Sequence, residues 1–315
     1  MDRVISYHVE KDYPSIRAFL KEKRYPAAVL SQLKRNPEQL EIFAEGPEME
    51  ERKDQNGHKL HEQLPVGTDL RVTIREEKGA SAQITPVEPR EHLKILYEDE
   101  DLLVIDKEAG VAVHPSLHHR EDSLANAVAQ YLEGKGEHIV FRCIHRLDKE
   151  TSGVIVIAKN MLSGGILAED MQERRIGKTY VAVCDGVFEN DPEKSGRAEK
   201  EGVIDVPIGR QEGSVILRCA DPEKGQPAET EYRVLKEGAD CSLVEFRPKT
   251  GRCHQIRIHA GFIGHPLLGD YLYYPHYEKI GRVALHAWKL ELTHPVTGEK
   301  MILESPIPDA FEKCL

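Results

Sequence analysis

The nine residues His145-Arg146-Leu147-Asp148-Lys149-Glu150-Thr151-Ser152-Gly153 lie between two mainly apolar runs, 139–144 and 154–158. The β-branched content of these runs predicts two buried strands, so the polar residues between them predict a tight turn. A carboxyl group with an ordinary pKa of about 3.9 is ionised at neutral pH, which makes Asp148 available as a nucleophile or a base. An unpaired buried charge is costly, so Asp148 requires a cationic partner. Taken alone, the stretch predicts a salt-bridged turn carboxylate.

A second polar segment contains a candidate partner for this carboxylate. It reads Thr250-Gly251-Arg252-Cys253-His254-Gln255-Ile256-Arg257-Ile258-His259 and is followed by Gly264-His265-Pro266-Leu267-Leu268-Gly269-Asp270. If 253–262 is a helix, His254, Arg257 and Gly261 share one face, and Arg257 can direct its guanidinium at a carboxylate on the sheet. The alternative is a surface helix with solvated cations. The apolar residues alternate too closely with the charges for that, so we expect a helix that is buried or faces a cleft.

A third segment, 174–182, predicts a strand on which Lys178 and Tyr180 point to the same face. The tyrosine ring offers a flat surface for stacking, and its hydroxyl offers a hydrogen bond or a proton transfer. Composition alone favours a tyrosine of the core.

Length and composition narrow the class of protein. A chain of 315 residues with 40% hydrophobic and 31% charged residues is typical of a soluble globular protein with two domains, or one large and one small. The sequence has neither an apolar run of about 18 residues nor a signal-peptide core, so we expect a cytoplasmic protein with no membrane partner. The net charge of −11 argues against a nucleic-acid partner, but residues 11–35 hold seven Lys or Arg against two acidic residues. An acidic total is therefore compatible with a local cationic patch.

Cysteines and histidines give no pattern of a metal site. The six cysteines include no C-x-x-C pair, which argues against a zinc knuckle and a disulfide framework. His114, His118 and His119 are close in sequence but have no nearby cysteine, and the acidic residues that follow them suit the start of a helix. We expect no metal.

The chain divides into two predicted parts joined by a linker. Residues 1–78 contain two short helices within 12–35 and strands near 40–43 and 70–74, which predicts a small α/β domain. Residues 79–90 are polar and proline-containing, as in a linker. Residues 91–315 predict many short strands, including 111–113, 139–144 and 215–219, with helices at 123–131 and 162–174. Too few helices alternate with strands for a parallel sheet, so we expect an α+β fold with a mixed, mainly antiparallel sheet and flanking helices.

Together these segments resemble the RluA-type pseudouridine synthase family. The pattern HRLD-x-x-TSG at 145–153 matches in full, and K-x-Y-x-A at 178–182, TGR-x-HQIR-x-H at 250–259 and GHP-x-x-GD at 264–270 match as well. The resemblance covers about residues 91–310. The first motif departs from the family's Lys-Pro-x-Gly, because Glu108 follows Lys107. The N-terminal part resembles the alpha-L RNA-binding module, with Asn56-Gly57 as its hairpin turn, although 45–54 is acidic.

The resemblance implies an isomerase that converts uridine in RNA to pseudouridine without a cofactor. Asp148 is then the essential carboxylate, either attacking the ribose or removing the 2′ proton to give a glycal; both routes stay open. Arg257 pairs with Asp148, and Tyr180 packs on the base and helps to remove the carbon-5 proton. Because the uridine must leave its stack, Arg146 is expected to fill the gap with its planar guanidinium.

Further RNA contacts are expected from cationic and polar side chains in both parts. They are Lys107, Lys178 and His254 in the larger part, and Arg17, Lys21, Lys23, Arg24, Lys34 and Arg35 in the smaller one. We expect a monomer acting on structured RNA, with ribosomal RNA favoured over transfer RNA.

Two other functions fit parts of the sequence. One is an RNA-binding protein that has lost catalysis, which the acidic charge and Glu108 would suit. The other is a glycoside hydrolase that uses Asp148 and Glu150, since such enzymes need two carboxyl groups about 5–9.5 Å apart. An aromatic content of 6% with one Trp is low for a sugar-stacking cleft.

Overall fold

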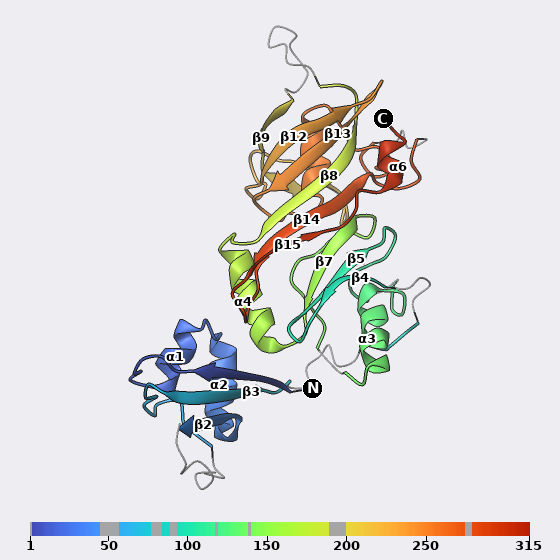
Figure 1. The fold of residues 1–315 in the computed structure, drawn as a ribbon. Coiled ribbons are helices and arrows are strands. Elements are labelled where there is room, and N and C mark those ends of the chain that lie inside the picture. The colour runs from blue at the N-terminus through green and yellow to red at the C-terminus, as the bar shows by residue number, and fades with distance from the viewer. Residues whose placement is uncertain are drawn as a thin grey trace.

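The computed structural model describes residues 2–44, 57–76, 84–88, 93–116, 119–137, 140–188, 200–274 and 279–315. The strands form a three-stranded, a two-stranded and a ten-stranded sheet. Figure 1 shows the three-stranded sheet with its helices at one end of the molecule and the ten-stranded sheet at the other. The hairpin turn expected at Asn56, the acidic stretch 45–54 and most of the linker 79–90 lie outside the described residues.

The small sheet has the order β1-β3-β2 and carries two helices. Its strands are β1 (Arg3–His8), β2 (Leu40–Ala44) and β3 (Thr68–Ile74), and its helices are α1 (Ile16–Glu22) and α2 (Ala27–Arg35), with the 3-10 helix η1 (Pro37–Gln39) before β2. The hydroxyl of Ser15 accepts a hydrogen bond of 3.1 Å from the Ala18 N–H and so caps α1. Alternate residues of β3, Leu70, Val72 and Ile74, are buried against α1 and α2. The sequence analysis found both helices but not β1.

The large sheet follows the order β4-β5-β7-β14-β8-β13-β12-β9, with β6 on β7 and β15 on β14. Its strands are β4 (Lys94–Glu98), β5 (Leu102–Lys107), β6 (Arg142–Cys143), β7 (Ser152–Ala158), β8 (Gly177–Asp185), β9 (Glu201–Asp205), β12 (Glu229–Glu237), β13 (Cys241–Pro248), β14 (Leu285–Thr293) and β15 (Lys300–Glu304). Neighbours pair antiparallel except β7 and β14, which are parallel. The mixed, mainly antiparallel sheet is therefore confirmed. Strands β10 (Ile208–Arg210) and β11 (Arg218–Ala220) form the two-stranded sheet.

Helices flank the large sheet as α3 (Leu124–Gly134), α4 (Met161–Gln172), α5 (Gln255–Phe262) and α6 (Asp309–Glu312). Ser123 and Asn126 form a capping box at the start of α3, and Asn160 caps α4 through the Ser163 N–H. In the part of the chain that the structure describes, no helix has the length and apolarity needed to cross a membrane.

Three predicted strands are wrong in extent. Residues 111–113 form no strand, because their carbonyl oxygens accept hydrogen bonds from Lys107 Nζ and from the Leu124 and Ala125 N–H groups instead of a neighbouring strand. Only 142–143 of the run 139–144 pairs with β7, and Ile139 lies outside the described residues. The run 215–219 begins exposed, and the strand β11 starts only at Arg218.

Strand β7 is the centre of the sheet and positions the polar turn. All seven of its residues are buried, with β5 on one side and β14 on the other. Gly153 makes the approach of β14 possible. Its φ is +109°, and a Cβ there would lie 2.2 Å from the carbonyl oxygen of Ala287.

Candidate active site

The turn before β7 holds Asp148 between two anchors. The buried Leu147 belongs to the apolar cluster between α3 and the sheet, and the Thr151 N–H donates to the Asp148 carbonyl at 3.1 Å. On the far side, the Lys149 carbonyl accepts hydrogen bonds from the Gly110 N–H at 2.9 Å and from Lys107 Nζ at 3.1 Å. The Asp148 side chain remains 32% exposed, so its carboxylate is held in place yet accessible.

Arg257 lies beside this carboxylate, but its main partner is another acid. Its Nη1 is 3.7 Å from Asp148 Oδ2, whereas its Nε and Nη2 lie 2.7 Å and 2.6 Å from the two oxygens of Asp270. The expected Arg257–Asp148 pair is therefore the weaker of two, and the bidentate pair with Asp270 fixes the guanidinium. Burial opposes the charged form, but the hydrogen bonds and charge of Asp270 prevail and raise the pKa of Arg257.

Helix α5 begins at Gln255, two residues later than predicted. His254 precedes it in the left-handed region with φ of +57°, and Gln255 Oε1 accepts hydrogen bonds from the Arg252 N–H and the Thr250 hydroxyl. His254 Nδ1 lies 2.6 Å from the Tyr273 hydroxyl, and its Nε2 lies 3.9 Å from Asp148 Oδ2. Burial lowers the pKa of His254 although Asp148 opposes this shift. The turn into α5 thus places the His254 ring next to the Asp148 carboxylate.

Tyr180 and Lys178 of β8 face the same space. Burial and the nearby Asp148 raise the pKa of Tyr180, and its hydroxyl has no hydrogen-bond partner within the described residues. Burial lowers the pKa of the half-buried Lys178. Both line a cavity of about 320 Å³. Six of the residues named from the sequence line it together: Arg146, Asp148, Lys178, Tyr180, His254 and Arg257.

Comparison with known proteins decides the family. The family model described as RNA pseudouridylate synthase matches residues 101–261. An uncharacterized RNA pseudouridine synthase of Bacillus subtilis is 38% identical over 240 residues, which are 76% of this chain and 76% of that protein. The chain belongs to the RluA-type RNA pseudouridine synthase family. The synthase is also 39% identical over 252 residues to the ribosomal large subunit pseudouridine synthase D of Nitrosomonas europaea, covering 77% of this chain and 69% of that one.

Solved structures agree with this assignment. The human RNA pseudouridylate synthase domain containing 1 aligns with a TM-score of 0.56 and 27% identity, covering 76% of this chain and 90% of that one. The synthase is therefore an isomerase with the pseudouridine synthase fold.

Two residues expected to contact RNA are engaged inside the synthase instead. Lys107 is 1% exposed, and its Nζ donates to the carbonyls of Glu108, Val111 and Lys149. Burial lowers the pKa of Lys107 to about 7, while three carbonyl acceptors match the three donors of the ammonium form. Arg24 binds the carboxylates of Asp170 and Glu169. The burial of Lys107 contradicts its expected contact with RNA, whereas the Arg24 side chain is 38% exposed and is already paired with two carboxylates.

The other five N-terminal cations that were expected to contact RNA are exposed and do not line the cavity. They are Arg17, Lys21, Lys23, Lys34 and Arg35. Lys23 Nζ lies over the rings of Tyr7 and Phe19 at 5.7 Å and 5.6 Å, and the Arg35 Nε donates to the Ser31 carbonyl. Arg146 is exposed at the cavity and has no partner within the described residues. Glu150 is not among the residues that line the cavity, which disfavours the two-carboxylate hydrolase.

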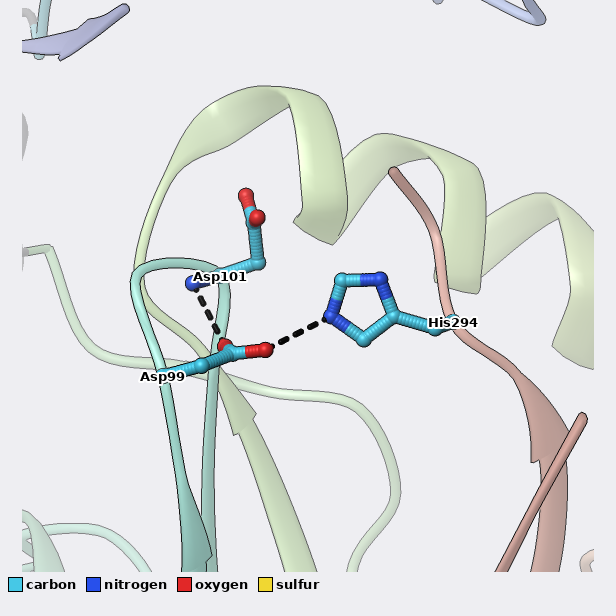
Figure 2. Close-up of side chains that lie close together, drawn as sticks. All are labelled: Asp99, Asp101 and His294. Atoms are coloured by element: carbon cyan, nitrogen blue, oxygen red, sulfur yellow. Dashed lines mark hydrogen bonds and ion pairs between the residues drawn. The ribbon is translucent and has the colours of Figure 1, made fainter. Parts of the chain in front are cut away.

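A cluster of Asp99, Asp101 and His294 brings three potential metal ligands together (Figure 2). His294 Nδ1 accepts from the Val296 and Thr297 N–H groups, so its Nε2 carries the proton and donates to Asp99 at 2.9 Å. Hydrogen bonds from His294 and Tyr97 lower the pKa of Asp99 although burial opposes them. Asp101 accepts hydrogen bonds from Asn160, Ser163 and Arg3. These atoms are already used in hydrogen bonds that join the β4–β5 turn to its neighbours, which is a structural role.

His114 and His119 also have partners within the protein. His119 Nδ1 lies 2.8 Å from Asp122, and the ring of His114 packs edge-on against Phe141. His118 lies outside the described residues. Asp270, by contrast, is a site residue that the sequence analysis did not single out, although it ends the quoted GHP-x-x-GD pattern.

Proposed function

We propose that the synthase isomerises a uridine of structured ribosomal RNA and that Asp148 is the carboxylate that reacts at its ribose. The observation that carries this proposal is the position of Asp148. Its partly exposed carboxylate faces a cavity of about 320 Å³, 3.7 Å from Arg257 and across from the unpartnered hydroxyl of Tyr180. Cavities of roughly 300–1,000 Å³ accommodate small organic groups, so a flipped base with its ribose fits this class of site.

The reaction breaks the bond between ribose carbon 1′ and base nitrogen 1 and forms a bond from carbon 1′ to base carbon 5. Asp148 either attacks carbon 1′ or removes the 2′ proton, which leaves a glycal. The base rotates while its ring is held in the cavity, carbon 5 loses its proton, and nitrogen 1 gains one. No atom is gained or lost overall, so the residues of the chain suffice for the chemistry.

Each neighbouring residue has a part in this proposal. Arg257, fixed by Asp270, places a positive charge beside the Asp148 carboxylate and orients it. In this proposal the ring of Tyr180 packs on the base, and its hydroxyl helps to remove the carbon-5 proton. Arg146 is exposed and has no partner among the described residues, which suits a guanidinium that fills the gap left by the flipped uridine. Lys178 and His254 contribute polar contacts to the bound nucleotide.

The substrate and the organisation of the chain complete the proposal. Ribosomal RNA is favoured because the relatives from Nitrosomonas europaea and Pseudomonas aeruginosa are named as ribosomal large subunit synthases. Residues 1–78 act as an alpha-L type RNA-binding domain, 79–90 as a linker and 91–315 as the catalytic domain. The exposed cations of α1 and α2 supply sequence-independent phosphate contacts. The synthase works as a monomer in the cytoplasm without a metal or cofactor.

The decisive experiment replaces the Asp148 carboxylate by an amide of the same shape. We expect Asp148→Asn to abolish tritium release from ribosomal RNA labelled at carbon 5 of uridine, because an amide is neither a nucleophile nor a base here. The melting temperature should stay within a degree or two, since the side chain is partly exposed. Glu150→Gln, two residues along the same turn, is the control and should retain activity. Release by Asp148→Asn at the wild-type rate would refute the assignment.

A further inference from the structure

The N-terminal sheet and its helices pack against α4 of the catalytic domain. Leu162 and Ile166 of α4 are buried in the same apolar cluster as Val29 and Leu33 of α2. Between them, Gly165 faces Pro26 so closely that a Cβ on Gly165 would lie 2.4 Å from the Pro26 Cγ. Figure 1 shows α4 extending from the large sheet toward the small one. The two parts thus share a core at this helix.

A charged contact closes one end of this interface. Arg24 Nη1 lies 3.4 Å from Asp170 Oδ2, its Nη2 contacts the other Asp170 oxygen, and Nη2 lies 3.3 Å from Glu169. The Asp170 side chain is only 3% exposed. Arg24 adopts a φ of +63° in the turn that ends α1, where the Tyr25 N–H donates to the Leu20 carbonyl at 2.9 Å. This turn places the Arg24 guanidinium where it meets the two carboxylates of α4.

Two further contacts close the other end. Glu76, two residues after β3, accepts the Met161 N–H of α4 at 2.8 Å and Arg142 Nη2 at 2.6 Å. Arg3 of β1 binds Asp101 at 2.8 Å, and Asp101 in turn accepts hydrogen bonds from Asn160 and Ser163 at the start of α4. The contacts at Met161 and Asp170 are about 13 Å apart along the helix axis, given a rise of 1.5 Å per residue. Contacts at both ends with packing between them oppose rotation as well as separation.

The same helix ends at the catalytic cavity. Met171 directly follows Asp170, which binds Arg24, and Met171 lines the cavity that holds Asp148 and Tyr180. The exposed Lys23 directly precedes Arg24 in the chain, and the exposed Lys21 lies three residues before Arg24. The docking contact therefore links a cationic segment of the N-terminal part to the wall of the cavity through one short piece of helix.

We propose that the N-terminal part is docked rigidly on α4 and selects RNA by the fixed distance between its cations and the catalytic cavity. Gly165 and Arg24 are positioning residues for this purpose. An RNA is then favoured only when its backbone reaches the N-terminal cations while its target uridine reaches Asp148. The proposal rests on the proposed function for its consequence in activity, but the docking itself is a property of the free protein. A freely tethered domain would instead recruit RNA without regard to this distance.

Two variants disturb the docking by different means. Gly165→Ala adds one methyl group against Pro26, while alanine is a better helix former than glycine and should not weaken α4 itself. Its control is Gly134→Ala at the end of α3, where a Cβ meets nothing within 4 Å. Arg24→Glu places a negative charge against Asp170 and Glu169. Its control is Lys59→Glu, which makes the same change of charge at an exposed residue of the N-terminal part.

The docking is measured first, by ¹⁵N relaxation of the free synthase. We expect backbone amides of the small and large sheets to give the same rotational correlation time in the wild type and in both controls. In Gly165→Ala and Arg24→Glu the small sheet should tumble faster than the large one. Different correlation times in the wild type would overturn the docking, and identical times in both variants would overturn the positioning role of Gly165 and Arg24, whatever the enzyme's activity.

The consequence is then measured with two RNA substrates. On a folded ribosomal RNA fragment, both variants should raise KM by about tenfold through the loss of effective concentration, with kcat within twofold of the wild type. On a short hairpin that carries only the target uridine, the KM of variant and wild type should agree. The role of docking in RNA selection would be overturned if an undocked variant kept the wild-type KM on the folded fragment. It would also be overturned if a control variant showed the same rise in KM. A wild type inactive on every RNA would refute the proposed function and leave the relaxation result valid.

Discussion

At the scale of single residues, Asp270 determines where the positive charge beside Asp148 lies. Arg257 is 3% exposed and Asp270 1% exposed, so neither charge is well solvated and each depends on the other. Removal of one partner of a buried pair leaves an uncompensated charge, which costs about 3–5 kcal/mol. In the proposed mechanism, Asp270 acts through the Arg257 guanidinium rather than by contact with the uridine.

We predict that Asp270→Asn lowers both stability and turnover. The free energy of unfolding, measured in urea, should fall by about 3–5 kcal/mol because Arg257 loses its charged partner. The kcat for tritium release should fall as the guanidinium no longer holds its place beside Asp148. Asp185→Asn, at the end of β8 and outside the cavity, is the control. Stability equal to the wild type would show that Arg257 does not depend on Asp270.

The sequence identified the chemistry-bearing residues better than their partners. Asp148, Tyr180 and Arg257 come from distant segments, yet each lies within a dense motif, and the structure brings all three to one cavity. Lys107 was expected to contact RNA as the lysine of the first family motif. Its burial under three carbonyl groups depends on the position of the Lys149 turn, 42 residues away. No local pattern in the sequence encodes that contact.

At the scale of elements, the parallel junction of β7 with β14 brings the Gly153 and Ala287 backbones close together. The parallel pairing sets His286 beside Ser152 and Ala287 beside Gly153. Ser152 Oγ accepts from Arg282 at 2.7 Å and donates to His286 Nδ1 at 2.8 Å, which continues the contact beyond the backbone. The catalytic turn ends at this junction, so its geometry depends on the junction.

We predict that Gly153→Ala is severely destabilising. The added Cβ would lie 2.2 Å from the Ala287 carbonyl oxygen, and the φ of +109° disfavours any side chain. Overpacking of a rigid core site costs about 1–3 kcal/mol, and the backbone strain adds about 1–2 kcal/mol. Gly110→Ala separates the two effects, because its φ is +82° but nothing lies within 4 Å of its Cβ. Equal losses in urea unfolding for the two variants would contradict a steric cause.

Helices were more predictable than short strands, for a physical reason. The caps at Ser15 and Ser123 and the periodic apolar residues behind them are local signals, and α1 and α3 begin where these signals place them. Val111 and Val113 have β-branched side chains, but the carbonyl groups of residues 111–113 accept hydrogen bonds from Lys107 and from the start of α3. Strand formation depends on a partner that a local pattern does not contain.

At the scale of the whole molecule, buried histidines tie stability to pH. Burial lowers the pKa of His145 and of His286 to about 4. His286 Nδ1 accepts from Ser152, and the buried Nδ1 of His145 has no hydrogen-bond partner within the described residues. Both rings are therefore neutral in the folded protein near neutral pH.

We predict that stability falls as the pH is lowered from about 6.5 to about 4. The unfolded chain binds protons at these two histidines in that window and the folded protein does not, so stability increases with pH there and each ring contributes about 3 kcal/mol. Urea unfolding at several pH values measures the slope, which His286→Asn should flatten. The exposed His61→Asn should leave it unchanged. A stability that is constant across the window would contradict neutral buried rings.

The arrangement of the two parts was the least predictable feature. A polar stretch at 79–90 suggested independent domains, and Arg24 looked like one more cation for RNA. Its partner Asp170 is 146 residues away in the sequence. The apolar residues of α4 would have the same pattern if all of them packed against the large sheet. A contact between the N-terminal part and the larger part does not change the periodicity of apolar residues in either part, so the sequence pattern does not predict it.

The position of β14 has a consequence for the synthesis of the chain. Strands β4 to β7 form one half of the large sheet and β8, β9, β12 and β13 the other, and β14 lies between the halves although it follows all of them in sequence. Asp148 precedes a strand of the first half, and Tyr180 belongs to the second. A chain still emerging from the ribosome can build both halves but cannot join them. The two halves of the active site are therefore joined in one late step, after β14 has been synthesised.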